Sequence, residues 1–100
     1  MSFTVTAFYK FVTIDDPVAF RPEVLDACRA NGIVGTVLLA HEGINGTLAG
    51  SANGIAAFLA WLRADERFGD LVSKESHAEK QPFGRLKVRL KREILTLGRP

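Results

Sequence analysis

The sequence predicts an α+β domain in which two helices cover one face of an antiparallel sheet. Three observations lead to this fold class. A helical repeat of apolar residues follows Ser51, two short apolar runs flank a glycine-containing turn near residue 43, and apolar residues alternate with cations over residues 86–91. The first pattern predicts a helix, the second predicts two strands joined by a turn, and the third predicts one strand; the other elements follow from the segments between them.

The composition is that of one globular domain with one core. The chain has 100 residues, of which 47% are hydrophobic and 24% charged. No apolar run approaches the roughly 20 residues that cross a bilayer, and the first residues lack a signal-peptide pattern, so a cytoplasmic location without membrane contact is expected. The single cysteine and two histidines provide neither a disulfide nor a zinc ligand set. No metal and no cofactor is therefore expected in this domain.

The first half begins with a strand and a helix. Residues 3–11 are rich in β-branched and aromatic types, which favour a strand. The next helix is expected to have an irregular first turn from Pro17 and a regular part from about Arg21, because Pro22 fits a first helical position but not an interior one. Gly32 ends this helix.

Cys28 is predicted to be a buried core residue. It lies late in the first helix and shares an apolar face with Val24 and Leu25. Reactive cysteines usually lie at helix N-termini or beside cations, where the thiolate is stabilised. A reactive role for Cys28 is therefore rejected, and it is interpreted as a small hydrophobic residue.

Two strands joined by a hairpin are predicted at residues 34–40 and 44–49. Either Glu42-Gly43 or Asn45-Gly46 could form the turn, because glycine accepts positive φ and Asn-Gly is the stronger general hairpin signal. A turn at Asn45-Gly46 would leave the second strand only about four residues before the next helix. The turn is therefore placed at Glu42-Gly43.

The second helix and the last strand are the most clearly marked elements. Ser51 caps a helix whose core-facing residues recur at helical spacing: Ile55, Phe58, Leu59 and Leu62. A polar connection with Phe68 beneath it leads to a weaker strand at residues 71–79. In the last strand three apolar residues alternate with three cations: Leu86, Val88 and Leu90 with Lys87, Arg89 and Lys91. A bulge at Arg92-Glu93 accounts for the change of phase before residues 94–97.

The resulting order is strand, helix, strand, strand, helix, strand, strand. It is the split βαβ pattern of ferredoxin-like domains, βαββαβ, with an extra C-terminal strand. Right-handed crossovers place both helices on one face of the sheet and leave the other face open. Function is therefore sought on the open face, although fold alone does not specify one.

Positive charge is concentrated in the last quarter of the chain. Residues 1–73 carry five basic and eight acidic side chains, whereas residues 74–100 carry eight basic and three acidic ones. Five of these cations lie on or beside the last strand and form a candidate nucleic-acid-binding surface: Arg85, Lys87, Arg89, Lys91 and Arg92. The alternative is that they protect an exposed strand from aggregation. Tyr9, Phe11 or Phe83 would offer a surface on which bases stack.

Three segments resemble one protein family. They are Phe8-Tyr9-Lys10-Phe11 in the first strand, Ala40-His41-Glu42-Gly43-Ile44-Asn45-Gly46-Thr47 at the hairpin, and Leu86-Lys87-Val88-Arg89 with Lys91-Arg92-Glu93-Ile94 at the end. In content, order and spacing these segments resemble the N-terminal, acylphosphatase-like domain of the rhodanese-related tRNA uridine hydroxylases of bacteria.

The resemblance implies a parent protein that is an oxidoreductase and forms 5-hydroxyuridine at the wobble position of tRNA, with its catalytic cysteine in a following rhodanese domain. That domain is absent from this chain. Residues 1–97 are expected to form a single ferredoxin-like domain, and residues 98–100 the start of a linker, as in a fragment of a longer protein. The fragment is expected to hold no catalytic residue and to be inactive alone, with tRNA and the rhodanese domain as its partners.

The family-motif hairpin supplies the remaining candidates, His41, Glu42, Gly43 and Asn45. Adjacent residues on a strand project to opposite faces, so His41 and Glu42 are poorly placed to act on one proton. The favoured interpretation is structural: Glu42-Gly43 forms the turn, His41 anchors it, and the Asn45 side chain hydrogen-bonds the hairpin backbone. The alternative is that His41 contacts tRNA or the rhodanese domain.

Two functions follow for the domain. In the first, it helps to bind or position tRNA through its basic strand. In the second, it is a structural domain whose open face docks on the rhodanese domain without touching RNA. A phosphohydrolase is rejected, because residues 12–17 offer no glycine-rich cradle or arginine and carry two carboxylates that repel phosphate.

Overall fold

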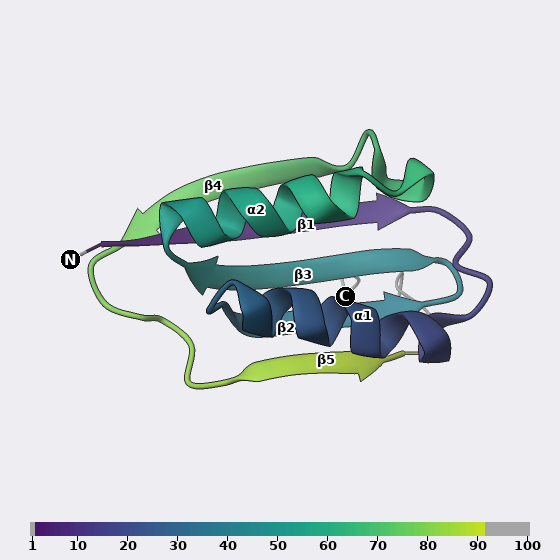
Figure 1. Ribbon diagram of the computed structural model, residues 1–100, viewed down its shortest axis with the longest axis horizontal. Coiled ribbons are helices and arrows are strands. Elements are labelled where there is room, and N and C mark those ends of the chain that lie inside the picture. Colours follow the sequence, from purple (N-terminus) through teal and green to yellow (C-terminus); the bar gives the residue numbers. More distant parts are fainter. Residues whose placement is uncertain (1, 92–100) are drawn as a thin grey trace, which may run out of the picture.

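The computed structural model describes residues 2–91 of the chain. Its strands and helices follow the predicted order (Figure 1): β1 (Phe3–Phe11), α1 (Pro17–Ala30), β2 (Val34–Ala40), β3 (Gly43–Gly50), α2 (Ala52–Arg63), β4 (Val72–Ala78) and β5 (Leu86–Leu90). A short 3₁₀ turn, η1 (Glu66–Phe68), lies between α2 and β4. The predicted bulge at Arg92-Glu93, the strand residues 94–97 and the linker residues 98–100 lie outside the described residues.

The five strands form one sheet in the order β4-β1-β3-β2-β5. β1 pairs antiparallel with β3 and β4, and β3 pairs antiparallel with β2, as predicted. β5 pairs parallel with β2, so the sheet is mixed rather than antiparallel throughout. The reason is the connection at residues 79–85, which crosses one end of the sheet from the β4 edge and delivers the chain to the free edge of β2 (Figure 1).

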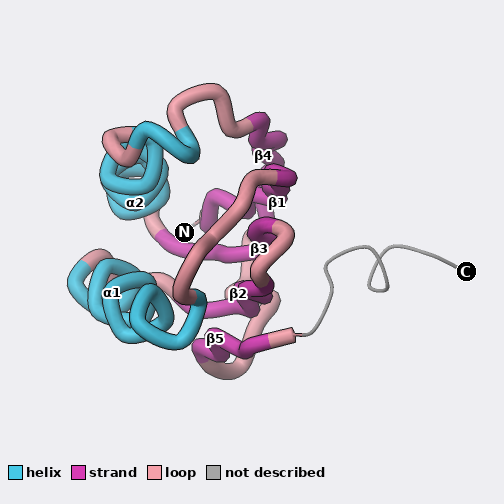
Figure 2. The backbone as a smooth tube through the Cα atoms, turned by 90° about the vertical axis from the view of Figure 1, so that its right-hand side faces the viewer, coloured by secondary structure: helices cyan, strands magenta, loops and turns pink. Residues whose placement is uncertain are grey.

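Both helices lie on one face of the sheet, and no helix of the described chain covers the other face (Figure 2). The core lies between these two layers. It is built from fully buried side chains of the sheet, among them Val37 and Leu48, and of the helices, among them Val24 and Phe58. The predicted open face is therefore confirmed for residues 2–91, and we use the term open face for the side of the sheet that points away from α1 and α2.

The first helix begins earlier than predicted. α1 starts at Pro17, and the Asp16 side chain caps it by accepting a hydrogen bond from the Ala19 backbone N–H at 3.1 Å. Pro22 is consequently inside the helix rather than at its first position. A proline at the first position and a carboxylate cap both favour a start at residue 17, and together they offset the backbone hydrogen bond that Pro22 cannot donate.

The second helix agrees with its prediction. Ser51 is the N-cap of α2, and its hydroxyl accepts a hydrogen bond from the Gly54 N–H at 2.9 Å. Phe58 and Leu62 are fully buried against the sheet, and Phe68 is buried beneath the connection that follows, as expected. The local signals of this segment therefore specified the element completely.

The hairpin turn consists of His41 and Glu42, because Ala40 of β2 pairs with Gly43 of β3. This is one residue before the predicted pair. Gly43 is the first residue of β3 and has a φ of 153°. Asn45-Gly46 lies inside β3, where it pairs with β1, so the alternative turn is excluded.

Candidate nucleic-acid interface

The cations of β5 point to the open face. Val88 faces the helices and is 1% exposed, whereas Lys87 and Arg89 alternate with it and pair in register with residues of β2 on the open side. The Lys91 N–H donates to the Leu39 carbonyl at 2.7 Å, which extends the ladder by one residue. Lys91 therefore follows Lys87 and Arg89 on the same face, as the alternation predicts.

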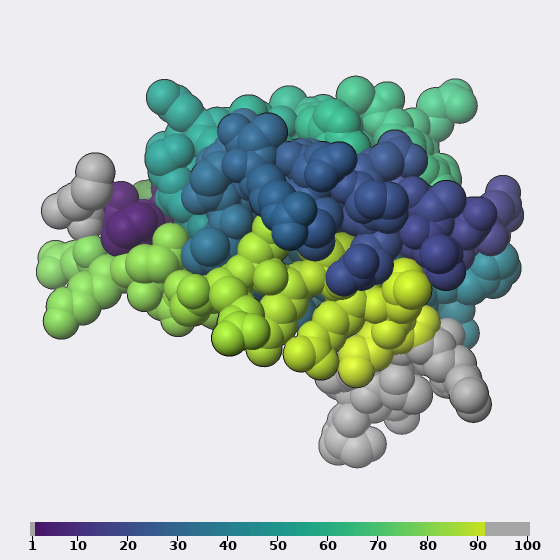
Figure 3. All heavy atoms as spheres, turned by 60° about the horizontal axis from the view of Figure 1, so that its bottom comes forward, coloured from purple at the N-terminus to yellow at the C-terminus, as the bar shows by residue number. Residues whose placement is uncertain are grey.

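The other two basic candidates differ from this row. Arg85 is exposed and precedes β5, and its backbone carbonyl accepts a hydrogen bond from the Gly35 N–H at 3.0 Å. Arg92 lies outside the described residues. β5 runs along the surface beside α1 (Figure 3), where the Arg21 side chain donates to the Val88 carbonyl. One edge of β5 is paired with β2. We use the term cationic edge for Lys87, Arg89 and Lys91.

Strand pairing aligns the open-face residues in rows that cross the whole sheet. One row runs from β4 to β5 through Val72, Tyr9, Asn45, Leu38 and Arg89. The next row runs through Lys74, Ala7, Thr47, Thr36 and Lys87. Each row therefore ends at a cation of β5, and the second row begins at another cation.

Two aromatic side chains stand on the open face of β1. Tyr9 is 55% exposed and Phe11 is 53% exposed, and their ring centroids are 6.0 Å apart with the ring planes tilted by 57°. This is the exposure that a stacking surface needs, and the sequence alone could not establish it. Phe83, the third aromatic candidate, is partly buried in the connection between β4 and β5.

The described strands carry no carboxylate on the open face. Among the described strands the one carboxylate is Glu75 of β4, which pairs with Thr6 and accepts a hydrogen bond from its hydroxyl at 2.7 Å on the helix side. The open-face positions of the five strands carry apolar, hydroxyl, amide or cationic side chains. An anionic ligand on this face therefore meets no carboxylate projecting from the described strands.

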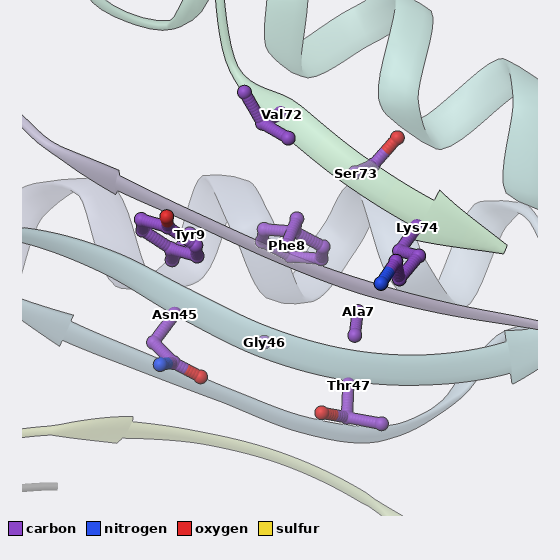
Figure 4. Close-up of a pocket in the computed structure, with 9 residues that line it drawn as sticks. All are labelled: Ala7, Phe8, Tyr9, Asn45, Gly46, Thr47, Val72, Ser73 and Lys74. Carbon is purple, nitrogen blue, oxygen red and sulfur yellow. The ribbon is translucent and has the colours of Figure 1, made fainter. Parts of the chain in front are cut away.

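A hollow of about 500 Å³ lies on the open face across β4, β1 and β3 (Figure 4). It forms around Ala7, whose single methyl group is flanked by larger side chains: Tyr9, Asn45, Thr47, Val72 and Lys74. Sequence reasoning did not assign Lys74, Thr47 or Ala7 to a site. Alternation along β4 could have predicted the face on which Lys74 lies. Which residues of β1 and β3 lie beside it depends on the strand order, which the sequence does not give.

The family-motif hairpin has a structural role through its backbone. The carbonyls of His41 and Glu42 accept hydrogen bonds from the Ile14 and Val12 N–H groups at 2.9 and 3.0 Å. His41 thus anchors the loop after β1 through its main chain, while its side chain is exposed. The Asn45 side chain borders the hollow, and its predicted hydrogen bond to the hairpin backbone stays a prediction.

The same two hydrogen bonds bear on the rejected phosphohydrolase. A phosphate cradle after β1 requires free backbone N–H groups that point at the anion. In this loop the Val12 and Ile14 N–H groups are already bound to the hairpin carbonyls. The geometry therefore gives a second reason, besides Asp15 and Asp16, why this loop is unsuited to hold a phosphate.

Cys28 is fully buried in α1, as predicted. Burial raises the pKa of its thiol to about 12 from an ordinary value of 9.0, because the thiolate is poorly solvated there. We expect the thiolate fraction near neutral pH to be about 1,000-fold below that of a free cysteine. Alkylation with iodoacetamide at pH 8 should be very slow in the folded chain and complete in denaturant; equal rates in both would contradict the buried position.

Residues 2–91 contain no group of three or more His, Cys, Asp or Glu side chains placed to hold a metal ion. The expectation that the domain has no metal and no cofactor stays a prediction. In the same part of the chain no helix is long and apolar enough to cross a membrane.

The fold and its open face define an α+β domain of the acylphosphatase-like class. A model of the UPF0176 acylphosphatase like domain matches residues 3–94, and the chain belongs to that family. The chain is 56% identical over 96 residues to a tRNA uridine(34) hydroxylase of Sinorhizobium medicae (strain WSM419), covering 96% of this chain and 30% of that protein. It is 53% identical over 98 residues to the protein of the same name in Albidiferax ferrireducens (strain ATCC BAA-621 / DSM 15236 / T118), covering 98% and 31%. The chain thus spans about a third of the length of these relatives.

Solved structures with low identity share the fold. An acylphosphatase from Coxiella burnetii superposes with a TM-score of 0.59 at 13% identity, covering 88% of this chain and 93% of that one. The structure titled BlrP1 BLUF superposes with a TM-score of 0.71 at 21% identity, covering 92% and 66%. At these identities the likeness concerns the arrangement of the sheet and helices alone.

Proposed function

We propose that this chain is the non-catalytic N-terminal domain of a tRNA wobble-uridine hydroxylase and that it binds the tRNA backbone along the cationic edge. The observation that carries the proposal is the row Lys87, Arg89 and Lys91, which stands on a sheet face whose described strands present no carboxylate. The names of the relatives support tRNA as the ligand.

The geometry of the row suits a nucleic-acid backbone. Residues two apart on a strand are separated by about 7 Å, so three cations form a line rather than a single anion pocket. Such a line contacts several phosphates, and each contact releases counterions and makes affinity depend on salt. Phosphate contacts fix the position of a nucleic acid without reading its sequence. The domain would therefore orient tRNA, while other parts of the protein select the uridine.

Chemistry is assigned to the rest of the protein. The oxidation of uridine to 5-hydroxyuridine belongs to the rhodanese domain and its cysteine, and the present chain is proposed to be inactive alone, without a cofactor, and to act in the cytoplasm where tRNA is found. Cys28 is unsuited to replace the catalytic cysteine because it is buried and its thiol pKa is raised to about 12.

A second function is favoured by the apolar part of the open face. Phe11 and Val72 are 53% and 66% exposed there, and exposed apolar side chains that lie together mark interaction surfaces. In this alternative the open face docks on the rhodanese domain and the cations are incidental. The two functions differ in whether the chain binds RNA.

Titration of the chain with unmodified tRNA separates them. We expect binding that weakens steeply between low and moderate salt, and a K87E/R89E/K91E variant that binds at least about tenfold more weakly with a shallower salt dependence. Arg89→Glu and Arg29→Glu form a matched pair, because both arginines are exposed and Arg29 lies on α1. Arg89→Glu should weaken binding and Arg29→Glu should have little effect.

Either of two results contradicts the proposal. Equal tRNA affinity of the wild type and the triple variant would show that the cationic edge does not contact the backbone. Absence of binding by the wild-type chain even at low salt would favour the docking function instead.

A further inference from the structure

We infer that the hollow around Ala7 binds one unpaired nucleotide, with its base against the Tyr9 ring and its phosphate at Lys74. The inference rests on the proposed function, since it supposes that the open face meets RNA, and it adds a site for the base. The hollow has a volume of about 500 Å³, which is within the range of small-molecule sites.

The Tyr9 ring is accessible for stacking with a base. It is 55% exposed, and the neighbouring Phe11 ring lies 6.0 Å away between centroids and supports it from one side. Figure 4 shows Tyr9 toward one end of the hollow and Lys74, with its cross-strand partner Ala7 beside it, toward the other. Stacking of a base on an aromatic side chain changes affinity by about 5-fold to 150-fold and works for every base.

Polar groups of β3 border the same hollow. The Asn45 and Thr47 side chains line it next to Ala7. An amide offers two donors and one acceptor, and a hydroxyl offers one donor, so both can pair with the edge of a base. Unpaired RNA bases are recognised in this way, by stacking and by contacts to their edges.

Lys74 and the cationic edge place positive charge at both ends of the open face, on the two edge strands β4 and β5. Lys74 is exposed and forms no salt bridge within the described residues, and its row ends at Lys87 on the opposite edge. Four strand spacings of about 4.8 Å separate the two, so the row is about 19 Å long. A short single strand can therefore cross the sheet from Lys74, over Tyr9, to the cationic edge.

The positive charge of the open face favours a nucleotide over a docked protein. An apolar partner would leave Lys74 buried without a counter-charge, at a considerable cost in desolvation. A phosphate at Lys74 supplies the counter-charge, while the base covers the apolar groups around Ala7. A docked protein is the outcome that remains if the chain does not bind RNA.

The test uses the 100-residue chain and two labelled probes at low salt, a uridine hexamer and an abasic hexamer with the same sugars and phosphates. Fluorescence anisotropy gives the affinities, and circular dichroism confirms that each variant is folded. Tyr9→Ala should weaken binding of the uridine hexamer by about 5-fold to 150-fold and leave the abasic hexamer unchanged. Tyr9→Phe keeps the ring and should retain most of the affinity.

Lys74→Gln and Lys80→Gln provide a matched comparison of two exposed lysines. Lys74→Gln should weaken the binding of both hexamers, and Lys80→Gln should weaken the binding of neither. Equal affinity of Tyr9→Ala and wild type for the uridine hexamer, while K87E/R89E/K91E loses binding, overturns the nucleotide site and leaves the proposed function standing. An equal loss for both probes in Tyr9→Ala also overturns it. Absence of RNA binding by the wild-type chain overturns both.

Discussion

Replacing Gly43 by alanine is expected to destabilise the chain by at least about 2 kcal/mol. Gly43 has a φ of 153°, a conformation that L side chains rarely adopt. A Cβ at this position would lie closer than 3.0 Å to the Lys10 carbonyl oxygen, and that oxygen belongs to the backbone of β1 between two neighbouring strands. The clash can be relieved only by moving the hairpin away from β1, which also disturbs the anchoring of the next loop by His41 and Glu42.

Gly84→Ala is the matched control. Gly84 lies in the connection before β5, and a Cβ added there would meet no atom within 4 Å. Its substitution should change stability by no more than about 0.5 kcal/mol. Urea unfolding followed by circular dichroism measures both variants. If the two variants unfold at the same urea concentration, Gly43 does not lie as close to β1 as described.

Local signals were sufficient where an element is defined by its own residues. Ser51 caps α2 and Phe58 is buried in it, as the spacing of apolar residues predicted. In β5 the alternation of Val88 with its basic neighbours was also enough to separate a buried side from an exposed side. In both segments the sequence pattern is compatible with only one type of element, so no second interpretation competed with it.

Competing local signals account for the errors of one or a few residues. Pro22 suggested a later start of α1, but the Asp16 cap and Pro17 determine the boundary. At the hairpin, glycines at 43 and 46 offered two turns, and neither pair forms the turn itself. His41 and Glu42 do, because Gly43 is needed where the chain approaches β1.

Pairing between distant strands is what the sequence did not reveal. β5 could have extended the β4 edge, and its position beside β2 depends on the free edge that β2 leaves. The hollow depends on the same information, because Ala7, Thr47 and Lys74 come from three strands and become neighbours only in the observed order. Lys87 and Arg89 lie in β5 and Lys91 directly follows it, so the cationic edge could be grouped from the sequence, whereas the residues of the hollow could not.

Replacing Phe58 by alanine is expected to be the most destabilising of the changes considered, at about 3–5 kcal/mol. Phe58 is fully buried in α2, and its ring centroid lies 6.1 Å from that of Phe8 in β1 and 5.9 Å from that of Trp61. Its loss would leave a cavity where the helix layer meets a central strand. Because domains of this size are stable by only about 5–15 kcal/mol, Tm should fall by at least about 12 °C.

Phe11→Ala removes the same atoms from the open face and serves as the control. Phe11 is 53% exposed, so truncation there should cost less than about 1 kcal/mol. Thermal unfolding followed by circular dichroism compares the two variants directly. A large loss of stability in Phe58→Ala with a small one in Phe11→Ala would place the core of this domain between the sheet and its helices. A loss of similar size in both would mean that the open face is itself packed against something, such as a second copy of the chain.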